Sequence, residues 1–351
     1  MKGQKTALDY GLGVGILKRG PRNAITDVEG VTVGHCTVDT PEHKTGVTVV
    51  IPSQDNMFLN KLVCACHVIN GFGKSQGLVQ LNELSTLETP IFLTNTLNLG
   101  LVHNAAVGYM LDLCSQDGVT LTSVNPIVCE CNDNFLNKIA ERVVTEKEVL
   151  SAIQSADKEF LQGDVGAGKG MSCHGLKGGI GTASRIVELD GKEYTLGMLV
   201  MSNYGLLEDL TLNGVKIGKD ISEKINYANT VDKGSIIMLI ATDIPMSARQ
   251  LKRINRRAVN GLARLGSITS HESGEIVISF TTANRIKMYS DQEIQSIGLL
   301  NEESMDKPFR AVQECCEEAI INSMICANEV TGYNGNTRKS LRDLIEQYHY
   351  F

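Results

Sequence analysis

The stretch Val231-Asp-Lys-Gly-Ser-Ile-Ile-Met-Leu-Ile-Ala-Thr-Asp-Ile-Pro245 indicates the architecture of this 351-residue chain. Its apolar run, residues 236–241, is long enough for a strand that is buried on both faces. Ser235 opens that run directly after Gly234. A nucleophile-type hydroxyl is unexpected at the first position of a buried strand. We therefore hypothesise that the chain cuts itself between Gly234 and Ser235.

Such a cut gives Ser235 both a hydroxyl and a free α-amine. An N-terminal amine titrates near pH ~7.7–8, so it accepts a proton from a neighbouring hydroxyl at neutral pH. This is the N-terminal-nucleophile variant of the serine-plus-base arrangement.

The composition is that of an ordinary globular protein, with 42% hydrophobic and 21% charged residues. The net charge of -7 argues against a general nucleic-acid binder. The first twenty residues lack the apolar core of a signal peptide, and no run approaches the ~18 apolar residues of a membrane span. Most of the ten cysteines lie inside apolar runs, as reduced buried thiols do. The sequence therefore predicts a cytoplasmic protein.

Apolar runs alternate with helical patterns along the chain, and they suit sheets buried between helical layers. The expected strands are 31–38, 46–52, 63–69, 90–94, 124–130, 194–202, the run from Ser235, and 275–282. The expected helices are 101–114, 134–139, 146–156, 247–264 and 309–326. A glycine-rich block, 163–181, is interpreted as turns.

The helix predicted over 247–264 carries an apolar stripe with six basic residues largely on its other faces. A solvated surface is the ordinary interpretation of such a charge run. A binding face for an acidic partner is the alternative.

Three familiar motifs fail on inspection. Gly163-Asp-Val-Gly-Ala-Gly-Lys-Gly170 nearly matches a phosphate loop, but Gly170 stands where the magnesium-binding hydroxyl belongs. His35, His67 and His174 each stand beside a cysteine without zinc-site spacing. No G-x-S-x-G elbow occurs. We predict no metal and no cofactor.

Two segments provide partners for Ser235. In Ser273-Gly274-Glu275, a hydroxyl and a carboxylate two residues apart can share one strand face, where Glu275 polarises Ser273. Asn203 ends another apolar strand, and its amide is a candidate oxyanion donor. Taken singly, both segments are typical of turns.

These segments belong to an ordered set that resembles the L-aminopeptidase D-esterase/D-amidase family, which includes the β-aminopeptidases. The set comprises Arg22-Asn-Ala-Ile-Thr-Asp-Val-Glu-Gly-Val-Thr-Val-Gly-His35, Asn132-Asp-Asn-Phe-Leu-Asn137, Gly163-Asp-Val-Gly-Ala-Gly168, Lys177-Gly-Gly-Ile-Gly-Thr-Ala-Ser-Arg185, Asn203-Tyr-Gly205, Gly234-Ser235 and Ser273-Gly-Glu275.

The resemblance implies a four-layer αββα sandwich, similar to N-terminal-nucleophile hydrolases but connected differently. It implies one domain, 1–351, cut into a large chain, 1–234, and a small chain, 235–351. Ser235 would be the nucleophile, Ser273 and Glu275 its supporting groups, and Asn203 the oxyanion-hole amide.

Family members release L-, D- or β-amino residues from short peptides, amides and esters. They use no metal or cofactor and assemble as oligomers, so the resemblance implies a homo-oligomer of processed heterodimers without nucleic-acid or membrane partners.

The resemblance also indicates a substrate pocket formed by Asn132, Phe135 and Tyr204. Phe135 stands where relatives carry a tyrosine, and it cannot donate a hydrogen bond. Tyr204 is a candidate replacement. Glu130 and Asp133 are candidates for binding the substrate's free amine.

Two other functions remain open from the sequence. The related fold hosts N-acyl transfer onto amino acids in arginine synthesis, generally with a threonine nucleophile, and Ser235 weighs against it. A catalytically inactive relative is the other alternative, and Phe135 is its support.

Overall fold

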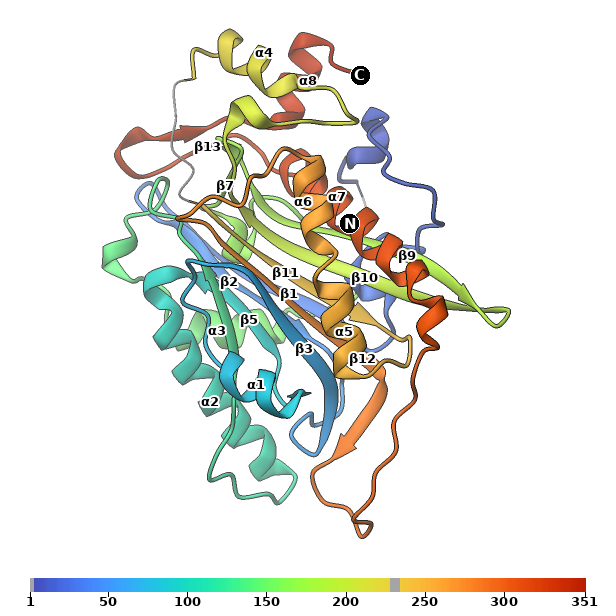
Figure 1. Ribbon diagram of the computed structural model, residues 1–351. Coiled ribbons are helices and arrows are strands. Elements are labelled where there is room, and N and C mark those ends of the chain that lie inside the picture. Colours follow the sequence, from blue (N-terminus) through green and yellow to red (C-terminus); the bar gives the residue numbers. More distant parts are fainter. Residues whose placement is uncertain (1–2, 228–233) are drawn as a thin grey trace.

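Two stacked β-sheets form the centre of the molecule (Figure 1). The computed structural model describes residues 3–227 and 234–351. In the larger sheet the described strands run β4 (Thr86–Leu87), β3 (Asn60–Gly71), β12 (Gly274–Lys287), β11 (Ser235–Thr242), β10 (Lys192–Asn203) and β9 (Gly179–Leu189). In the smaller sheet they run β1 (Thr32–Asp39), β2 (Lys44–Ile51), β5 (Ile91–Asn95) and β6 (Ile127–Cys131).

Helices cover the outer face of each sheet (Figure 1). The smaller sheet packs on α2 (Leu99–Gln116) and α3 (Glu146–Gln154). The larger sheet packs on α5 (Ala248–Asn255), α6 (Ala258–Arg264) and α7 (Asp306–Ile325). The other described α-helices are α1 (Leu78–Leu84), α4 (Ile217–Lys224) and α8 (Leu341–Tyr348). Two small hairpins pair β7 (Ser172–Cys173) with β8 (Leu176–Lys177) and β13 (Val330–Thr331) with β14 (Thr337–Arg338). The four-layer αββα prediction is confirmed.

Strand β11 explains why its sequence is apolar without alternation. Ile237 and Leu239 face the core between the two sheets, whereas Ile236 and Met238 face the core beneath the helices. Since successive side chains of a strand point to opposite faces, a strand buried on both faces needs apolar residues at every position.

Most predicted elements are present, with three corrections. No α-helix forms over 134–139, because the Leu136 and Asn137 N–H groups both bond the Asp133 carbonyl in a single turn. The helix predicted over 247–264 is two helices, α5 and α6, separated at 256–257.

The third correction is β9, which the glycine-rich interpretation missed. Gly181 allows close packing of the strand and does not form a turn. A Cβ on Gly181 would lie 1.9 Å from the Ala319 carbonyl oxygen. The absence of side chains lets α7 approach the strand.

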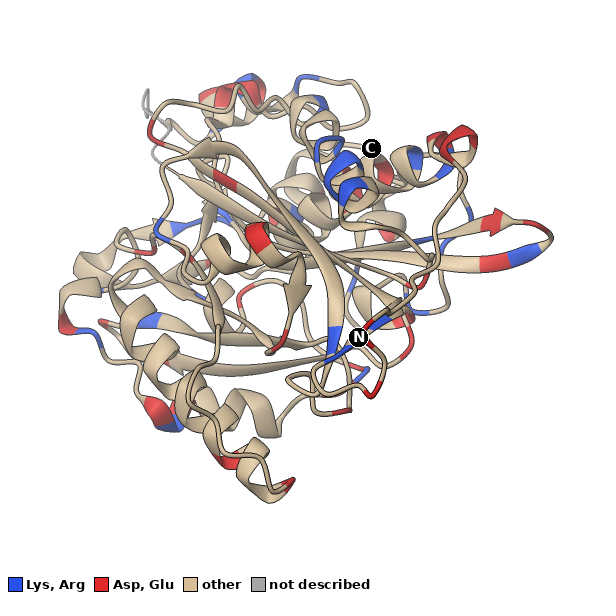
Figure 2. Cartoon of the chain, turned by 60° about the horizontal axis from the view of Figure 1, so that its bottom comes forward, with Lys and Arg blue, Asp and Glu red and all other residues tan. Residues whose placement is uncertain are grey.

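The basic residues of α5 and α6 are paired mostly within the chain. Arg249 and Arg253 both contact Glu302, and Arg264 contacts Glu317. The Arg257 guanidinium lies 4.0 Å from the centroid of the Phe309 ring. Acidic and basic residues are interspersed over the surface elements (Figure 2). This favours the solvated-surface interpretation over an acidic-partner face.

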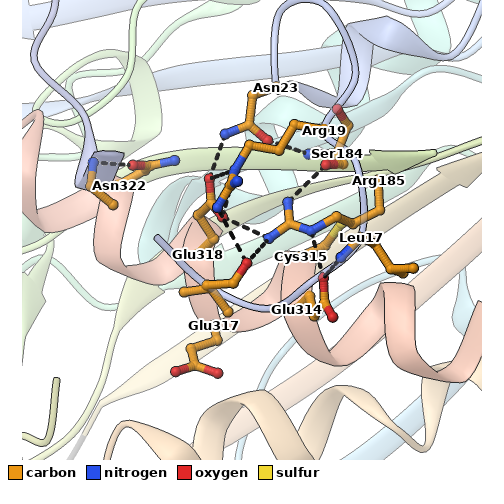
Figure 3. A network of polar contacts seen from close by, with 12 residues as sticks. Leu17, Arg19, Asn23, Ser184, Arg185, Glu314, Cys315, Glu317, Glu318 and Asn322 are labelled. Atoms are coloured by element: carbon orange, nitrogen blue, oxygen red, sulfur yellow. Dashed lines mark hydrogen bonds and ion pairs between the residues drawn. The ribbon is translucent and has the colours of Figure 1, made fainter. Parts of the chain in front are cut away.

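A buried ion network joins the N-terminal segment and β9 to α7 (Figure 3). Arg185 is fully buried and contacts Glu314 at 2.8 Å and Glu318 at 2.6 Å. Arg19 bonds both oxygens of Glu318, with N···O distances of 3.0 and 2.8 Å. Burial alone raises the pKa of Glu318, but the hydrogen bond from Arg19 and the charge of Arg185 outweigh it and hold that pKa below its usual value.

The ten cysteines are free thiols, nine of them buried and Cys36 half-buried. None of the described helices combines the length and apolar character needed to cross a membrane.

Candidate active site

The predicted catalytic residues lie together at the ends of three neighbouring strands of the larger sheet. Ser235 is the first residue of β11, and it pairs with Asn203, the last residue of β10. On its other side Ser235 pairs with Gly274, the first residue of β12. Ser273 and Glu275 flank that glycine. Segments far apart in sequence therefore supply a hydroxyl, an amide, a second hydroxyl and a carboxylate around one strand end.

The Gly234–Ser235 bond is held tightly. Ser235 is 6% exposed. The Gly274 N–H donates to the Gly234 carbonyl oxygen at 3.3 Å. A Cβ on Gly234 would lie 2.0 Å from the Asn203 carbonyl oxygen and 2.5 Å from the Tyr204 Cα. Only glycine fits before the serine without displacing backbone.

The orientation of the Asn203 amide is set by two backbone groups. Its Oδ1 accepts from the Ser172 N–H at 2.8 Å, and its Nδ2 donates to the Asn132 carbonyl at 3.0 Å. The second bond crosses from the larger sheet to the loop that follows β6. The second Nδ2 hydrogen makes no hydrogen bond among the described residues. Since Asn203 pairs with Ser235 in the sheet, this amide N–H is a candidate for stabilising an oxyanion.

Ser273 and Glu275 are both fully buried. The Ser273 N–H bonds the Ser270 carbonyl at 3.0 Å, and the Asn70 side chain bonds the Ser273 carbonyl. The Ser273 Oγ has no hydrogen-bond partner among the described residues. Since buried hydroxyls are nearly always paired, this unpaired hydroxyl, one residue before the Gly274 that pairs with Ser235, is a candidate for proton transfer.

Sequence reasoning missed Asn70. Its Nδ2 also reaches the Ser270 carbonyl at 3.0 Å, so it closes the turn that carries Ser273. Asn70 directly follows the predicted strand 63–69 and precedes a glycine, which is a turn signal. Its contact with a segment about two hundred residues away has no signal in the sequence.

The predicted pocket residues are placed differently from one another. Asn132 is exposed, and its Oδ1 accepts from the Asn134 N–H at 3.1 Å. Phe135 is half-buried beneath the Arg338 guanidinium, which lies 3.5 Å from its ring centroid. Tyr204 is only 2% exposed and lies in the core against His174, so its ring is not in the position of Phe135.

The two candidate amine-binding carboxylates also differ. Glu130 is 2% exposed, and it accepts from the Lys74 N–H at 2.9 Å and from the Thr96 hydroxyl. Asp133 is fully buried, and burial raises its pKa to about 7. A carboxyl group that is half protonated near neutrality is a weak anchor for an ammonium, so Glu130 is the better candidate.

The segment that resembles a phosphate loop is occupied by the protein itself. Lys169 pairs with Asp39 at 2.8 Å and Asp164 at 3.0 Å. The buried Lys177 donates to the carbonyls of Gly168, Met171 and Gly178 at 2.7–2.9 Å. These lysines hold the glycine-rich block together. No group of three or more metal-ligating side chains occurs in the part of the chain that the structure describes.

Comparison with known proteins identifies the family. The model of peptidase family S58 matches residues 23–338. The chain belongs to peptidase family S58. A β-peptidyl aminopeptidase of Sphingosinicella microcystinivorans is 35% identical over 359 residues, which cover 94% of this chain and 89% of that protein.

Two solved structures share the fold over nearly the whole chain. The PH0078 protein of Pyrococcus horikoshii has a TM-score of 0.91 and 44% identity, covering 99% of this chain and 100% of that one. The L-aminopeptidase D-Ala-esterase/amidase of Ochrobactrum anthropi, described as a new variant of the Ntn hydrolase fold, has a TM-score of 0.88 and 33% identity, covering 98% and 99%.

This S58 protein is therefore a hydrolase, a serine aminopeptidase or amidase. The comparisons support neither alternative, the N-acyltransferase or the inactive relative.

Proposed function

We propose that this aminopeptidase matures by cutting itself between Gly234 and Ser235, and that Ser235 is its nucleophile. The observation that carries the proposal is the Gly274 N–H on the Gly234 carbonyl oxygen. A hydrogen bond to a carbonyl oxygen polarises the carbonyl and stabilises the oxyanion formed by attack at its carbon.

In maturation, the Ser235 Oγ attacks the Gly234 carbonyl carbon. The peptide C–N bond breaks, the Ser235 nitrogen takes a proton and becomes the free amine, and an ester joins Gly234 to the Ser235 oxygen. Water then hydrolyses that ester. Before the cut the Ser235 nitrogen is an amide and is not basic. Proton removal from its hydroxyl in this step therefore falls to the Glu275 carboxylate, which takes the proton by way of the Ser273 hydroxyl.

In turnover, the Ser235 Oγ attacks the carbonyl of the substrate's N-terminal residue and forms an acyl-enzyme. Asn203 donates its remaining amide hydrogen to the oxyanion, and water releases the acyl group. Either the new amine or the Ser273–Glu275 pair takes the proton. Glu130 binds the substrate's ammonium. The substrates are short peptides, amides or esters with an L-, D- or β-amino residue.

The two chains, 1–234 and 235–351, stay together after the cut. Strands β10 and β11 pair along eight residues across the division. In the buried network, Arg19 and Arg185 belong to the large chain, whereas Glu314 and Glu318 belong to the small one (Figure 3). The cytoplasmic location and a homo-oligomer of these heterodimers are part of the same proposal.

The test is the intact mass of the purified protein under denaturing conditions. The 38.1 kDa chain should give fragments of about 25 and about 13 kDa, since mass follows residue number. The smaller fragment should begin at Ser235. Ser235→Ala should remain uncut and inactive towards amino-acid amides. Ser290→Ala, at an exposed serine, is the matched control and should mature normally. A Ser235→Ala protein cut at the same bond would refute the proposal.

Ser273→Ala separates the two candidate bases. If the amine acts in turnover, this variant matures slowly, but its matured fraction hydrolyses substrate at a rate near wild type per active site. If Ser273 acts in both steps, both rates fall together.

A further inference from the structure

Arg338, in β14, lies beside the active site in an unusual environment. Its guanidinium stacks 3.5 Å from the Phe135 ring centroid. Its Nε donates to the Ser172 Oγ at 2.9 Å, and its Nη1 to the Tyr227 hydroxyl at 3.5 Å. These partners are all neutral.

No carboxylate pairs with Arg338 among residues 3–227 and 234–351, although its side chain is half-buried. Burial lowers the pKa of this arginine, because desolvation disfavours the charged form. Buried cations are normally paired, as Arg185 is with Glu314 and Glu318. Arg338 is thus a partly desolvated cation whose two Nη2 hydrogens have no acceptor in the described chain.

The position of Arg338 is fixed from both sides. Asn336 donates to the Phe135 carbonyl at 2.8 Å, and the Tyr333 N–H donates to the Leu136 carbonyl at 2.9 Å. The Lys177 N–H donates to the Lys339 carbonyl at 2.8 Å. The hairpin of β13 and β14 is therefore bound to the loop after β6 and to β8, and Arg338 is held in place (Figure 1).

Ser172 connects Arg338 to the catalytic centre. Its Oγ accepts from Arg338, while its N–H donates to the oxyanion amide, Asn203. In the strand order β3-β12-β11-β10, this contact lies on the β10 side of Ser235. Lys74, whose N–H bonds Glu130, follows β3 on the opposite side. Because a substrate ammonium is attracted to Glu130 and repelled by Arg338, the arginine would contact the part of the substrate that leaves.

We propose that Arg338 binds a carboxylate on the leaving group, and so makes the enzyme select short peptides over neutral amides of the same acyl residue. This inference rests on the proposed function of Ser235. The guanidinium presents parallel N–H donors that fit a carboxylate, and a desolvated pair of this kind is strong. The carboxylate is either the C-terminal α-carboxylate of a dipeptide or the side chain of an acidic second residue.

Three substrates with one common acyl residue, X, test the proposal on the matured wild-type enzyme. They are X-Ala, X-Ala amide and X-Asp amide, with X taken as the residue released fastest from its simple amide. We expect kcat/KM for X-Ala to exceed that for X-Ala amide by about ten- to a hundredfold, the size of a charge-assisted hydrogen bond. Comparable preference for X-Asp amide would assign the site to a side-chain carboxylate. Equal values for all three substrates would overturn the proposal.

Arg338→Met should bring the ratio for X-Ala over X-Ala amide towards one. The ratio is informative because a general loss of activity or folding lowers both rates. Arg338→Gln, which keeps a donor for Ser172, replaces it if the methionine variant does not fold. Arg285→Met is the matched control, since Arg285 is also half-buried with a pKa lowered by burial, and it lies towards the far end of β12. Its ratio should equal that of wild type.

A purely structural role for Arg338 predicts an unchanged ratio in its variants, and that result would overturn the proposal while leaving Ser235 as nucleophile. Conversely, hydrolysis that persists in Ser235→Ala would refute the proposed function by itself.

Discussion

The backbone N–H of Gly274 donates a hydrogen bond to the carbonyl oxygen of Gly234, with an N···O distance of 3.3 Å. The bond follows from the parallel pairing of β11 with β12, in which Ser235 lies opposite Gly274. Sheet register thus brings a fixed donor to the carbonyl that Ser235 attacks in the proposed self-cleavage. In the maturation that we propose, this donor would stabilise the oxyanion without any side-chain movement.

Gly234→Ala should block or greatly slow maturation. The new Cβ would lie 2.0 Å from the Asn203 carbonyl oxygen, and a backbone atom cannot move away without disturbing β10. Gly100→Ala in α2 is the control, because its Cβ meets nothing within 4 Å. The fraction of cut chain, measured by denaturing mass spectrometry over time, checks this. Wild-type maturation of Gly234→Ala would contradict the role of close packing at the cut site.

Asn203→Asp should lower kcat by about 10²–10³. The carboxylate keeps the shape of the amide but has no hydrogen to donate, and its charge repels a developing oxyanion. Maturation should continue, because its oxyanion has the Gly274 N–H. Separate kcat and KM values for an amino-acid amide test this, with thermal unfolding as the check on folding. If kcat stays at the wild-type level, Asn203 is not the oxyanion donor.

Arg185→Met should destabilise the protein by about 3–5 kcal/mol, because it leaves the buried Glu314 without its ion-pair partner and Glu318 with Arg19 alone. Since the network joins the large chain to the small one, the variant should also release fragments at lower urea concentrations. Arg249→Met, at a surface pair with Glu302, should change stability little. Urea unfolding and size-exclusion chromatography measure both effects. Equal stability of the two variants would rule out a special role for the buried network.

Asp133→Asn should change how stability depends on pH. Burial raises the pKa of Asp133 from 3.8 to about 7, so the folded state binds its proton more tightly than the unfolded state does. The stability from this group is therefore complete below about pH 4 and is lost as pH rises through about 7. By pH 8 the loss is about 4 kcal/mol for the wild type and absent in the variant. Unfolding free energies from pH 4 to pH 8 test this, and parallel curves for the two proteins would contradict it.

Local patterns were enough for much of the fold. The apolar run after Ser235 predicts β11, and the ordered motifs indicate both the αββα layers and the four candidate catalytic residues. The pattern failed where glycine had a non-local role: Gly181 looks like a turn residue, but α7 packs against it inside β9. It failed again at Arg256 and Arg257, where α5 and α6 separate within one apolar stripe.

By itself, the sequence determined that Ser235 opens an apolar strand after a glycine, because an apolar run and a turn residue before it are local features of the sequence. Only the tertiary structure decided which groups surround that serine. The Gly274 N–H lies on the Gly234 carbonyl, Asn70 bonds the Ser273 carbonyl, and Ser172 links Arg338 to Asn203, and all of these groups come from segments remote in the chain. Their positions depend on strand register and on the docking of the C-terminal hairpin, and such long-range pairing is set by the packing of the whole molecule.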